Sequence, residues 1–205
     1  MLGSSYTVGA GVEAELTFPF LLEAYLNQRY SESGTERFQV LNLAYPGESV
    51  LRSSSRLENQ ALDFDVDYAI YMAVTEETQF VLRNLRDVVK RETENVDPFL
   101  LDIVRQAEVT SDMTADEIER RLRPYADELL EWGYREFASF AEQHGIVPIV
   151  FVLPRTGDTV SQYNNEWEHL SGIARNAGLT AMNLKGVYGS LQERNNLKLA
   201  PWDWH

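Results

Sequence analysis

Short runs of hydrophobic residues alternate along the 205-residue chain with segments in which hydrophobic residues recur at helical spacing. Five short apolar segments predict buried strands at 1–2, 38–43, 67–73, 146–153 and 179–184. Between them, apolar residues recur every three or four positions and predict helices at 18–30, 49–62, 80–92, 116–144 and 161–176. Strands that are apolar throughout and separated by helices predict an α/β fold with a parallel sheet covered on both faces.

The loops that follow parallel strands meet at one edge of the sheet, because the crossovers between the strands are right-handed. Ligands in such folds bind outside the carboxyl ends of the strands. The segments to inspect for function are therefore the C-terminal tail and the loops at 3–11, 44–49, 74–78 and 154–158.

The connection between the strand ending at Ala73 and the strand beginning at Ile146 is unusually long. A crossover needs one helix, and these roughly 70 residues have room for two or three. We expect a single domain over 1–205 with a helical insertion at about 80–143. The insertion is rich in acidic residues, which favours a solvated surface element over the alternative, a lid above the site.

Composition narrows the possible functions. With 18 Lys and Arg against 32 Asp and Glu, the net charge is −14, which argues against a nucleic-acid partner. The absence of Cys excludes disulfides, zinc–thiolate sites and thiol nucleophiles. No apolar run reaches 18 residues and no signal peptide is visible, so we expect a soluble protein whose compartment and oligomeric state stay open.

The loop at 3–11, Gly-Ser-Ser-Tyr-Thr-Val-Gly-Ala-Gly, follows the first strand and admits three interpretations. It can be an ordinary turn. It can be a phosphate cradle, although no Lys follows and the spacing fits neither common glycine motif. It can also present Ser5 as a nucleophile whose own N–H contributes to an oxyanion hole. The loop alone leaves all three open.

The C-terminal end favours the third interpretation. Asp203 precedes His205 by two residues, so an extended segment projects both side chains to one face. A carboxylate there can orient the imidazole and stabilise the imidazolium. The alternative is a terminal His without a role. His144 lies at a predicted helix end and His169 inside a helix, where we expect solvated or packed rings.

Three blocks in this order resemble the SGNH hydrolases, the GDSL-like lipases and esterases. Residues 3–11 resemble their first block, GDS-x-T-x-G-x-G, and Asn42 to Ser49 resembles the second, with Gly47 as its glycine. Residues 203–205 resemble the last block in its short D-x-H form.

The resemblance implies a role for each matched residue. Ser5 is the nucleophile, His205 the general base and acid, and Asp203 the orienting carboxylate; the N–H groups of Ser5 and Gly47 donate to the oxyanion. It also implies a three-layer α/β/α sandwich with a flavodoxin-like sheet in the order 2-1-3-4-5. The activity implied is hydrolysis of carboxylic esters of glycans, lipids or small molecules through an acyl-enzyme, with no metal or organic cofactor.

The chain departs from the family pattern at two positions. Ser4 replaces the Asp of GDS, which is not the nucleophile. The third block, G-x-N-D, falls on 73–76, where Thr75 replaces the Asn whose side chain donates to the oxyanion. Thr75 takes that place in the expected oxyanion hole beside Gly47, with one hydroxyl donor on a shorter stem. Loss of one such donor costs a factor of roughly 10²–10³ in rate, and Gln79 and Asn164 are candidate substitutes. The first strand and the end after the last block are also shorter than the family pattern, which predicts a fragment.

Several functions remain as alternatives to an esterase or deacetylase. The acyl-enzyme can pass its acyl group to a glycan hydroxyl, or the fold can be a non-catalytic carbohydrate- or partner-binding module with a degraded oxyanion hole. A flavodoxin-like nucleotide-binding protein fits least, because no basic residue lies in the loop at 3–11. Trp202 and Trp204 flank the last block and either stack on substrate or anchor the terminal loop.

Overall fold

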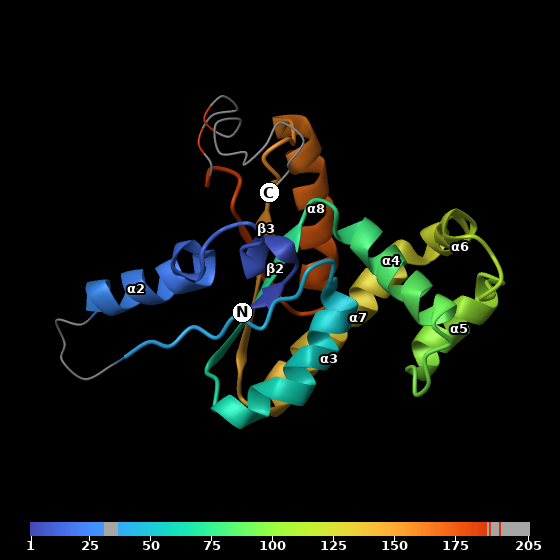
Figure 1. Cartoon of the computed structure of the whole chain (residues 1–205), viewed down its shortest axis with the longest axis horizontal. Helices are drawn as coiled ribbons and strands as arrows, with labels where there is room; N and C mark the ends of the chain where they lie inside the picture. Colours follow the sequence, from blue (N-terminus) through green and yellow to red (C-terminus); the bar gives the residue numbers. More distant parts are fainter. Residues whose placement is uncertain (31–36, 188, 190–192, 194–205) are drawn as a thin grey trace.

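A four-stranded parallel sheet forms the centre of the described chain (Figure 1). The computed structural model describes residues 1–30, 37–187, 189 and 193. The strands lie in the order β1-β2-β3-β4. Their bounds are β1 (Leu2–Gly3), β2 (Tyr68–Val74), β3 (Val147–Leu153) and β4 (Thr180–Asn183). The predicted α/β class with a parallel sheet is confirmed.

Most helices lie where the hydrophobic periodicity predicts them. The α-helices are α1 (Ser5–Val8), α2 (Phe18–Tyr30), α3 (Val50–Gln60), α4 (Glu77–Lys90), α5 (Pro98–Gln106), α6 (Ala115–Leu122), α7 (Ala126–Gln143) and α8 (Val160–Asn176). Short 3₁₀ turns are η1 (Ala14–Leu16), η3 (Ala61–Phe64) and η4 (Arg123–Tyr125). The helix predicted over 116–144 is divided at η4, because Pro124 has no N–H to continue an α-helix.

One face of the sheet, here called the covered face, carries the main hydrophobic core. Helices α3, α4, α7 and α8 pack on it. Tyr71 of β2 is fully buried there, with its ring centroid 6.1 Å from that of Tyr134 and 6.2 Å from that of Phe137, both of α7. Alternation along the strands directs further buried side chains to the same face, namely Ala69, Ala73, Val150 and Val152.

The opposite face, here called the open face, is only partly covered in the described structure. A smaller cluster, which includes Met72 and Leu153, gathers near the carboxyl ends of the strands, and Tyr6 of α1 and Leu22 of α2 pack against it. Towards the amino ends of β2 and β3 the face is exposed to solvent, and Tyr68 and Val147 keep 61% and 48% of their accessible surface. The structure is consistent with a three-layer α/β/α arrangement, in which the helical layer on the covered face is the more complete of the two.

The predicted strand count and order are wrong in one respect. Residues 38–43 form no strand, so the sheet has four strands in the described residues instead of five in the order 2-1-3-4-5. The segment nevertheless runs beside β1, because the Leu43 N–H donates to the Met1 carbonyl (2.8 Å) and the Tyr45 N–H to the Gly3 carbonyl (3.0 Å). The two residues of β1 are too short a partner for a regular ladder.

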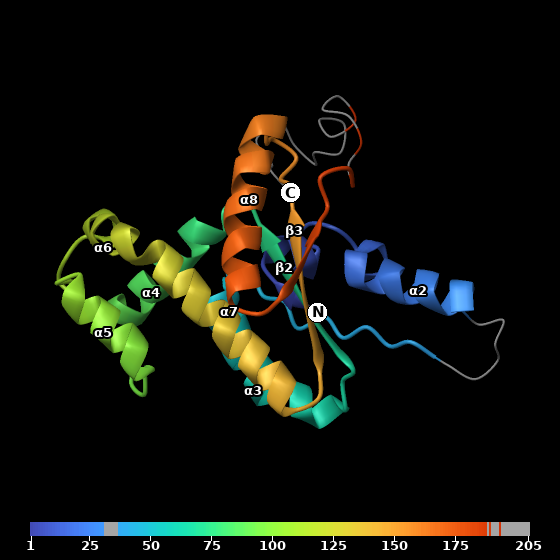
Figure 2. The ribbon, with the colours of Figure 1, turned by 180° about the vertical axis from the view of Figure 1, so that it is seen from behind.

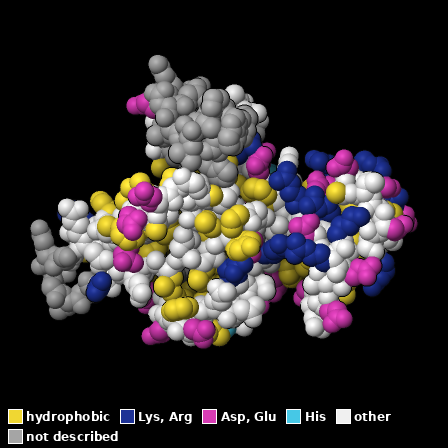
Figure 3. All heavy atoms as spheres, in the orientation of Figure 1, with side chains coloured by type: hydrophobic (Ala, Val, Ile, Leu, Met, Phe, Trp, Pro, Cys, Tyr) yellow, Lys and Arg dark blue, Asp and Glu magenta, His cyan; other side chains and the backbone are white. Residues whose placement is uncertain are grey.

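Two helical extensions lie at opposite ends of the molecule. Helices α5 and α6 of the predicted insertion extend at one end, whereas α7 packs on the sheet with α3 and α8 (Figures 1 and 2). Helix α2 extends at the other end and leaves Phe20, Leu21 and Tyr25 at least 49% exposed; hydrophobic side chains gather there in Figure 3. None of the described helices combines the length and apolarity needed to cross a membrane.

Candidate functional site

The turn between β1 and α1 places Ser5 at the carboxyl edge of the sheet. Gly3 has φ +142°, and a Cβ there would lie 2.5 Å from the Thr7 Oγ1 and 2.9 Å from the Met72 carbonyl oxygen. Only glycine therefore permits this tight turn. The following Ser4 is 2% exposed with its hydroxyl turned inward, while Ser5 is half-buried. Of the two hydroxyls, that of Ser5 lies nearer to solvent.

The loop that contains Gly47 is fastened to this turn. The Tyr45 N–H donates to the Gly3 carbonyl, and the Asn42 side chain donates to the Thr7 carbonyl at 3.2 Å. The Glu48 N–H then donates to the Tyr45 carbonyl at 3.2 Å, and Gly47 has φ +75°, which is typical of a type II turn with Pro46 and Gly47 at its centre. Two loops separated by about 40 residues are thus held together, as parallel topology predicts.

Within the described residues the Gly47 N–H donates to no acceptor. Gly47 is exposed, and no atom lies within 4 Å of the position that a Cβ would take. The backbone conformation, and not crowding, therefore explains the glycine. An N–H with this exposure can donate to a ligand at the sheet edge.

The loops after β2 and β3 meet in a charged cluster that sequence reasoning missed. The Thr75 hydroxyl donates to Asp158 Oδ2 (2.5 Å), and Arg155 donates through Nε to Thr75 (3.2 Å) and to Asp158 Oδ1 (3.0 Å). Arg155 also pairs with Glu76 at 2.5 Å. The loop at 154–158 was singled out as part of the edge, but nothing in the sequence indicated that Arg155 and Asp158 would enclose Thr75.

The charged cluster lies close to the Ser5 turn. Burial alone would lower the pKa of Arg155, but the negative charges of Asp158 and Glu76, together with Tyr6, raise it. Tyr6, which directly follows Ser5, packs on the cluster that includes Leu153, at the end of the strand that precedes Arg155. Asp158 is 2% exposed and ion-paired with Arg155, so the cluster fixes the loop at 154–158 against the loop at 74–78.

Glu77, a buried side chain at the start of α4, holds the start of α3, which follows the Gly47 loop. Ser49 precedes α3 without capping it through its own side chain. Instead Glu77 accepts a hydrogen bond from the Val50 N–H (2.9 Å) and another from the Tyr71 hydroxyl (2.5 Å). Burial raises the pKa of Glu77 to about 7, although both hydrogen bonds favour the carboxylate. No sequence pattern indicated this role, because the partners lie 27 residues apart.

A cavity of about 600 Å³ opens on the other side of the same region, between α3, α4, α5 and α7. Glu48, Asn84 and Trp132 are among its lining residues, whereas Ser5 and the Thr75 cluster are not. Burial, followed by the charges of Glu58 and Asp97, raises the pKa of Glu136 in its wall. This cavity is therefore separate from the predicted ester site.

The remaining predicted site residues, Trp202, Asp203, Trp204 and His205, lie outside the described residues. The structure thus brings the Ser5 turn, the Gly47 loop and the Thr75 loop to one edge, and the imidazole and its carboxylate remain predictions. His144 directly follows α7, and its Nδ1 lies 2.8 Å from the Phe140 carbonyl oxygen. The Nε2 of His169 lies 3.2 Å from Oδ1 of Asp127 on α7. In the described ranges, no group of three or more His, Cys, Asp or Glu could hold a metal ion.

Comparison with known proteins adds no relative: no model of a protein family matches the chain, and no curated protein or solved structure does.

Proposed function

We propose that this protein is a serine-dependent ester hydrolase of the SGNH type, with Ser5 as its nucleophile. The observation that carries the proposal is the Tyr45–Gly3 backbone hydrogen bond, which joins the loop of Gly47 to the turn of Ser5. The resemblance requires those two loops to be neighbours, because both donate N–H groups to one oxyanion. Their sequences alone leave that contact untested.

In the proposed reaction the Ser5 Oγ attacks the ester carbonyl carbon while His205 accepts the hydroxyl proton. The carbonyl oxygen becomes an oxyanion that the Ser5 and Gly47 N–H groups stabilise. Collapse of the tetrahedral intermediate breaks the ester C–O bond, and His205 returns the proton to the departing alcohol. Water, deprotonated by His205, then attacks the acyl-enzyme and releases the carboxylic acid and Ser5. Asp203 orients the imidazole throughout.

Thr75 takes the position of the family's third oxyanion donor, but its hydroxyl proton is already donated to the Asp158 carboxylate. The hydroxyl would have to leave Asp158 before it could donate to substrate. We therefore assign the oxyanion to the two backbone donors and expect a rate below that of an enzyme with the family's Asn. Trp202 and Trp204 remain candidates for binding the acyl or sugar group.

Hydrolysis of p-nitrophenyl acetate by the whole chain tests the proposal directly. We expect measurable turnover that Ser5→Ala abolishes, while Ser4→Ala, which removes the adjacent inward-facing hydroxyl, retains it. A fluorophosphonate probe should label the wild type at Ser5, as identified by peptide mass spectrometry. Equal hydrolysis by the wild type and Ser5→Ala would contradict the proposal.

The engaged Thr75 hydroxyl favours one second candidate, a binding module that keeps the fold without catalysis. Absence of Ser5 labelling together with glycan binding in a calorimetric titration would support it. A glycan O-acyltransferase shares the acyl-enzyme and predicts the same labelling. It is distinguished by its product, an acylated glycan formed from an acyl donor and a sugar acceptor.

A further inference from the structure

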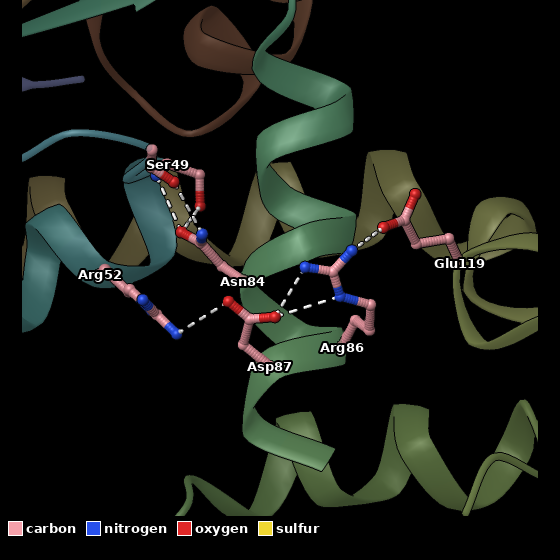
Figure 4. Close-up of polar contacts among 7 residues, drawn as sticks. Ser49, Arg52, Asn84, Arg86, Asp87 and Glu119 are labelled. Atoms are coloured by element: carbon pink, nitrogen blue, oxygen red, sulfur yellow. Dashed lines mark hydrogen bonds and ion pairs between the residues drawn. The ribbon is translucent and has the colours of Figure 1, made fainter. Parts of the chain in front are cut away.

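Asn84 of α4 is buried beneath the Gly47 loop and holds it from both sides. Its Nδ2 donates to the Gly47 carbonyl at 2.9 Å. Its Oδ1 accepts from the Ser49 N–H and the Ser49 hydroxyl, each at 2.8 Å (Figure 4). Asn84 is 3% exposed and its two bonds to Ser49 are buried, whereas its bond to the exposed Gly47 is partly buried. One amide thus fixes the backbone on both sides of Glu48.

These contacts determine how the Gly47 turn sits on the protein. The turn is closed within itself by the Glu48–Tyr45 bond, and one end is anchored by the Tyr45–Gly3 bond. The Gly47 carbonyl has Asn84 as its anchor on the other end. With both ends fixed, the peptide between Pro46 and Gly47, which carries the Gly47 N–H, has a defined direction. Glu48 is held as well, by its ion pair with Arg56, but of the described side chains it is Asn84 that bonds to the Gly47 carbonyl itself.

The same helix ties the turn to α3 and to the extension formed by α5 and α6. Asp87 pairs with Arg52 of α3, and Arg86 pairs with Asp87 and with Glu119 of α6 (Figure 4). Asn84 and Arg86 therefore face different partners from neighbouring positions of α4: Asn84 contacts the Gly47 loop, and Arg86 contacts α6. This difference provides a matched pair for experiment.

We infer that Asn84 is a positioning residue that aims the Gly47 N–H at the oxyanion. The inference rests on the proposed function, because it assigns a role within that reaction. Misdirecting a transition-state donor lowers kcat, whereas substrate binding in the ground state changes little. Displacement by about 1 Å can cost roughly 10²-fold in rate.

The decisive variant is Asn84→Asp. An ionised Asp keeps an acceptor for Ser49 but cannot donate to the Gly47 carbonyl, so we expect kcat at pH 8 to fall by roughly 10- to 100-fold with KM within about threefold. A protonated Asp has an O–H that can donate to that carbonyl. Burial at this position raises the pKa of the introduced carboxyl above its ordinary value. The ratio of variant to wild-type kcat should therefore recover as the pH is lowered, a change that loss of packing alone would not produce.

Arg86→Gln serves as the control, because it weakens the attachment of α4 to α6 without touching the Gly47 loop. Its kcat should equal that of the wild type when both are measured fully folded, as checked by circular dichroism. An unchanged kcat for Asn84→Asp, or an equal loss for Arg86→Gln, overturns the role of Asn84 and leaves the esterase proposal intact. If the wild type shows no Ser5-dependent turnover, the proposed function and this role are both overturned.

Discussion

Two tyrosines on strand β2 show how differently the two faces of the sheet are built. Tyr71 points to the covered face, is fully buried and contacts rings of α7, whereas Tyr68, three positions earlier, keeps 61% of its surface exposed. Both belong to one apolar run that the sequence predicts as buried on both faces. Hydrophobicity therefore identifies the strand, but only the packed helices determine which side chains contribute to stability.

The covered face is the more sensitive to truncation, and Phe137→Ala should show the largest effect. Phe137 is fully buried against Tyr71, so the variant loses burial and leaves a cavity, which costs about 3–5 kcal/mol. Urea unfolding followed by circular dichroism measures the loss, with Phe137→Leu as a milder control. A loss below 1 kcal/mol would mean that this face is not the stabilising core.

The covered face also contains a buried carboxyl, and Glu77→Gln tests what that group contributes as pH changes. The folded pKa is about 7, above the ordinary value of 4.5. The folded state thus binds this proton more tightly, and the contribution to stability is full below pH 4.5 and lost as the pH rises through 7. The shift corresponds to about 3 kcal/mol between pH 4.5 and 8.

Glutamine has no such proton and can still accept from the Val50 N–H, so the variant should gain stability relative to the wild type as pH rises. Unfolding free energies at pH 5, 6, 7 and 8 measure that difference, in which other titrating groups cancel. Parallel pH profiles for the two proteins would show that Glu77 does not titrate in this range.

The open face should give the smallest response. Tyr68→Thr removes a largely exposed ring and keeps a residue with good strand propensity, so we expect a change within about 0.5 kcal/mol of the wild type. The same urea titration measures it. A cost approaching that of Phe137→Ala would show that another part of the chain, or a second molecule, covers this face.

How far the sequence predicted the molecule depends on the range of the interactions involved. Local periodicity was enough for α2, α4 and α8, whose ends lie within three residues of those predicted. The strand predicted at 38–43 failed because a ladder needs a partner, and β1 supplies only Leu2 and Gly3. The hydrophobic pattern of 38–43 is local to that segment and does not show which strand lies beside it.

The candidate site divides in the same way. Gly3 and Gly47 carry local signals, because their backbone conformations with positive φ favour glycine. Ser5 is indicated by its position directly after the first strand. Asn84 and Asp158 act through contacts with residues 35 to 83 positions away, and an Asn or Asp within a polar stretch gives no sign of such a partner. Thr75 was expected to donate to the oxyanion, but its engagement by Asp158 depended on a loop whose path only the fold reveals.

The long connection between the central strands has a consequence for how the chain folds. Tyr68 pairs with Val147, 79 positions later. Pairing of β2 with β3 therefore closes a large loop, and the chain entropy is lost before the hydrogen bonds of the ladder form. Contact between α4 and α7, which lie within that loop, shortens the effective distance between the strands. We therefore expect the packing of α4 against α7 to form in the rate-limiting step, with β2 and β3 pairing afterwards.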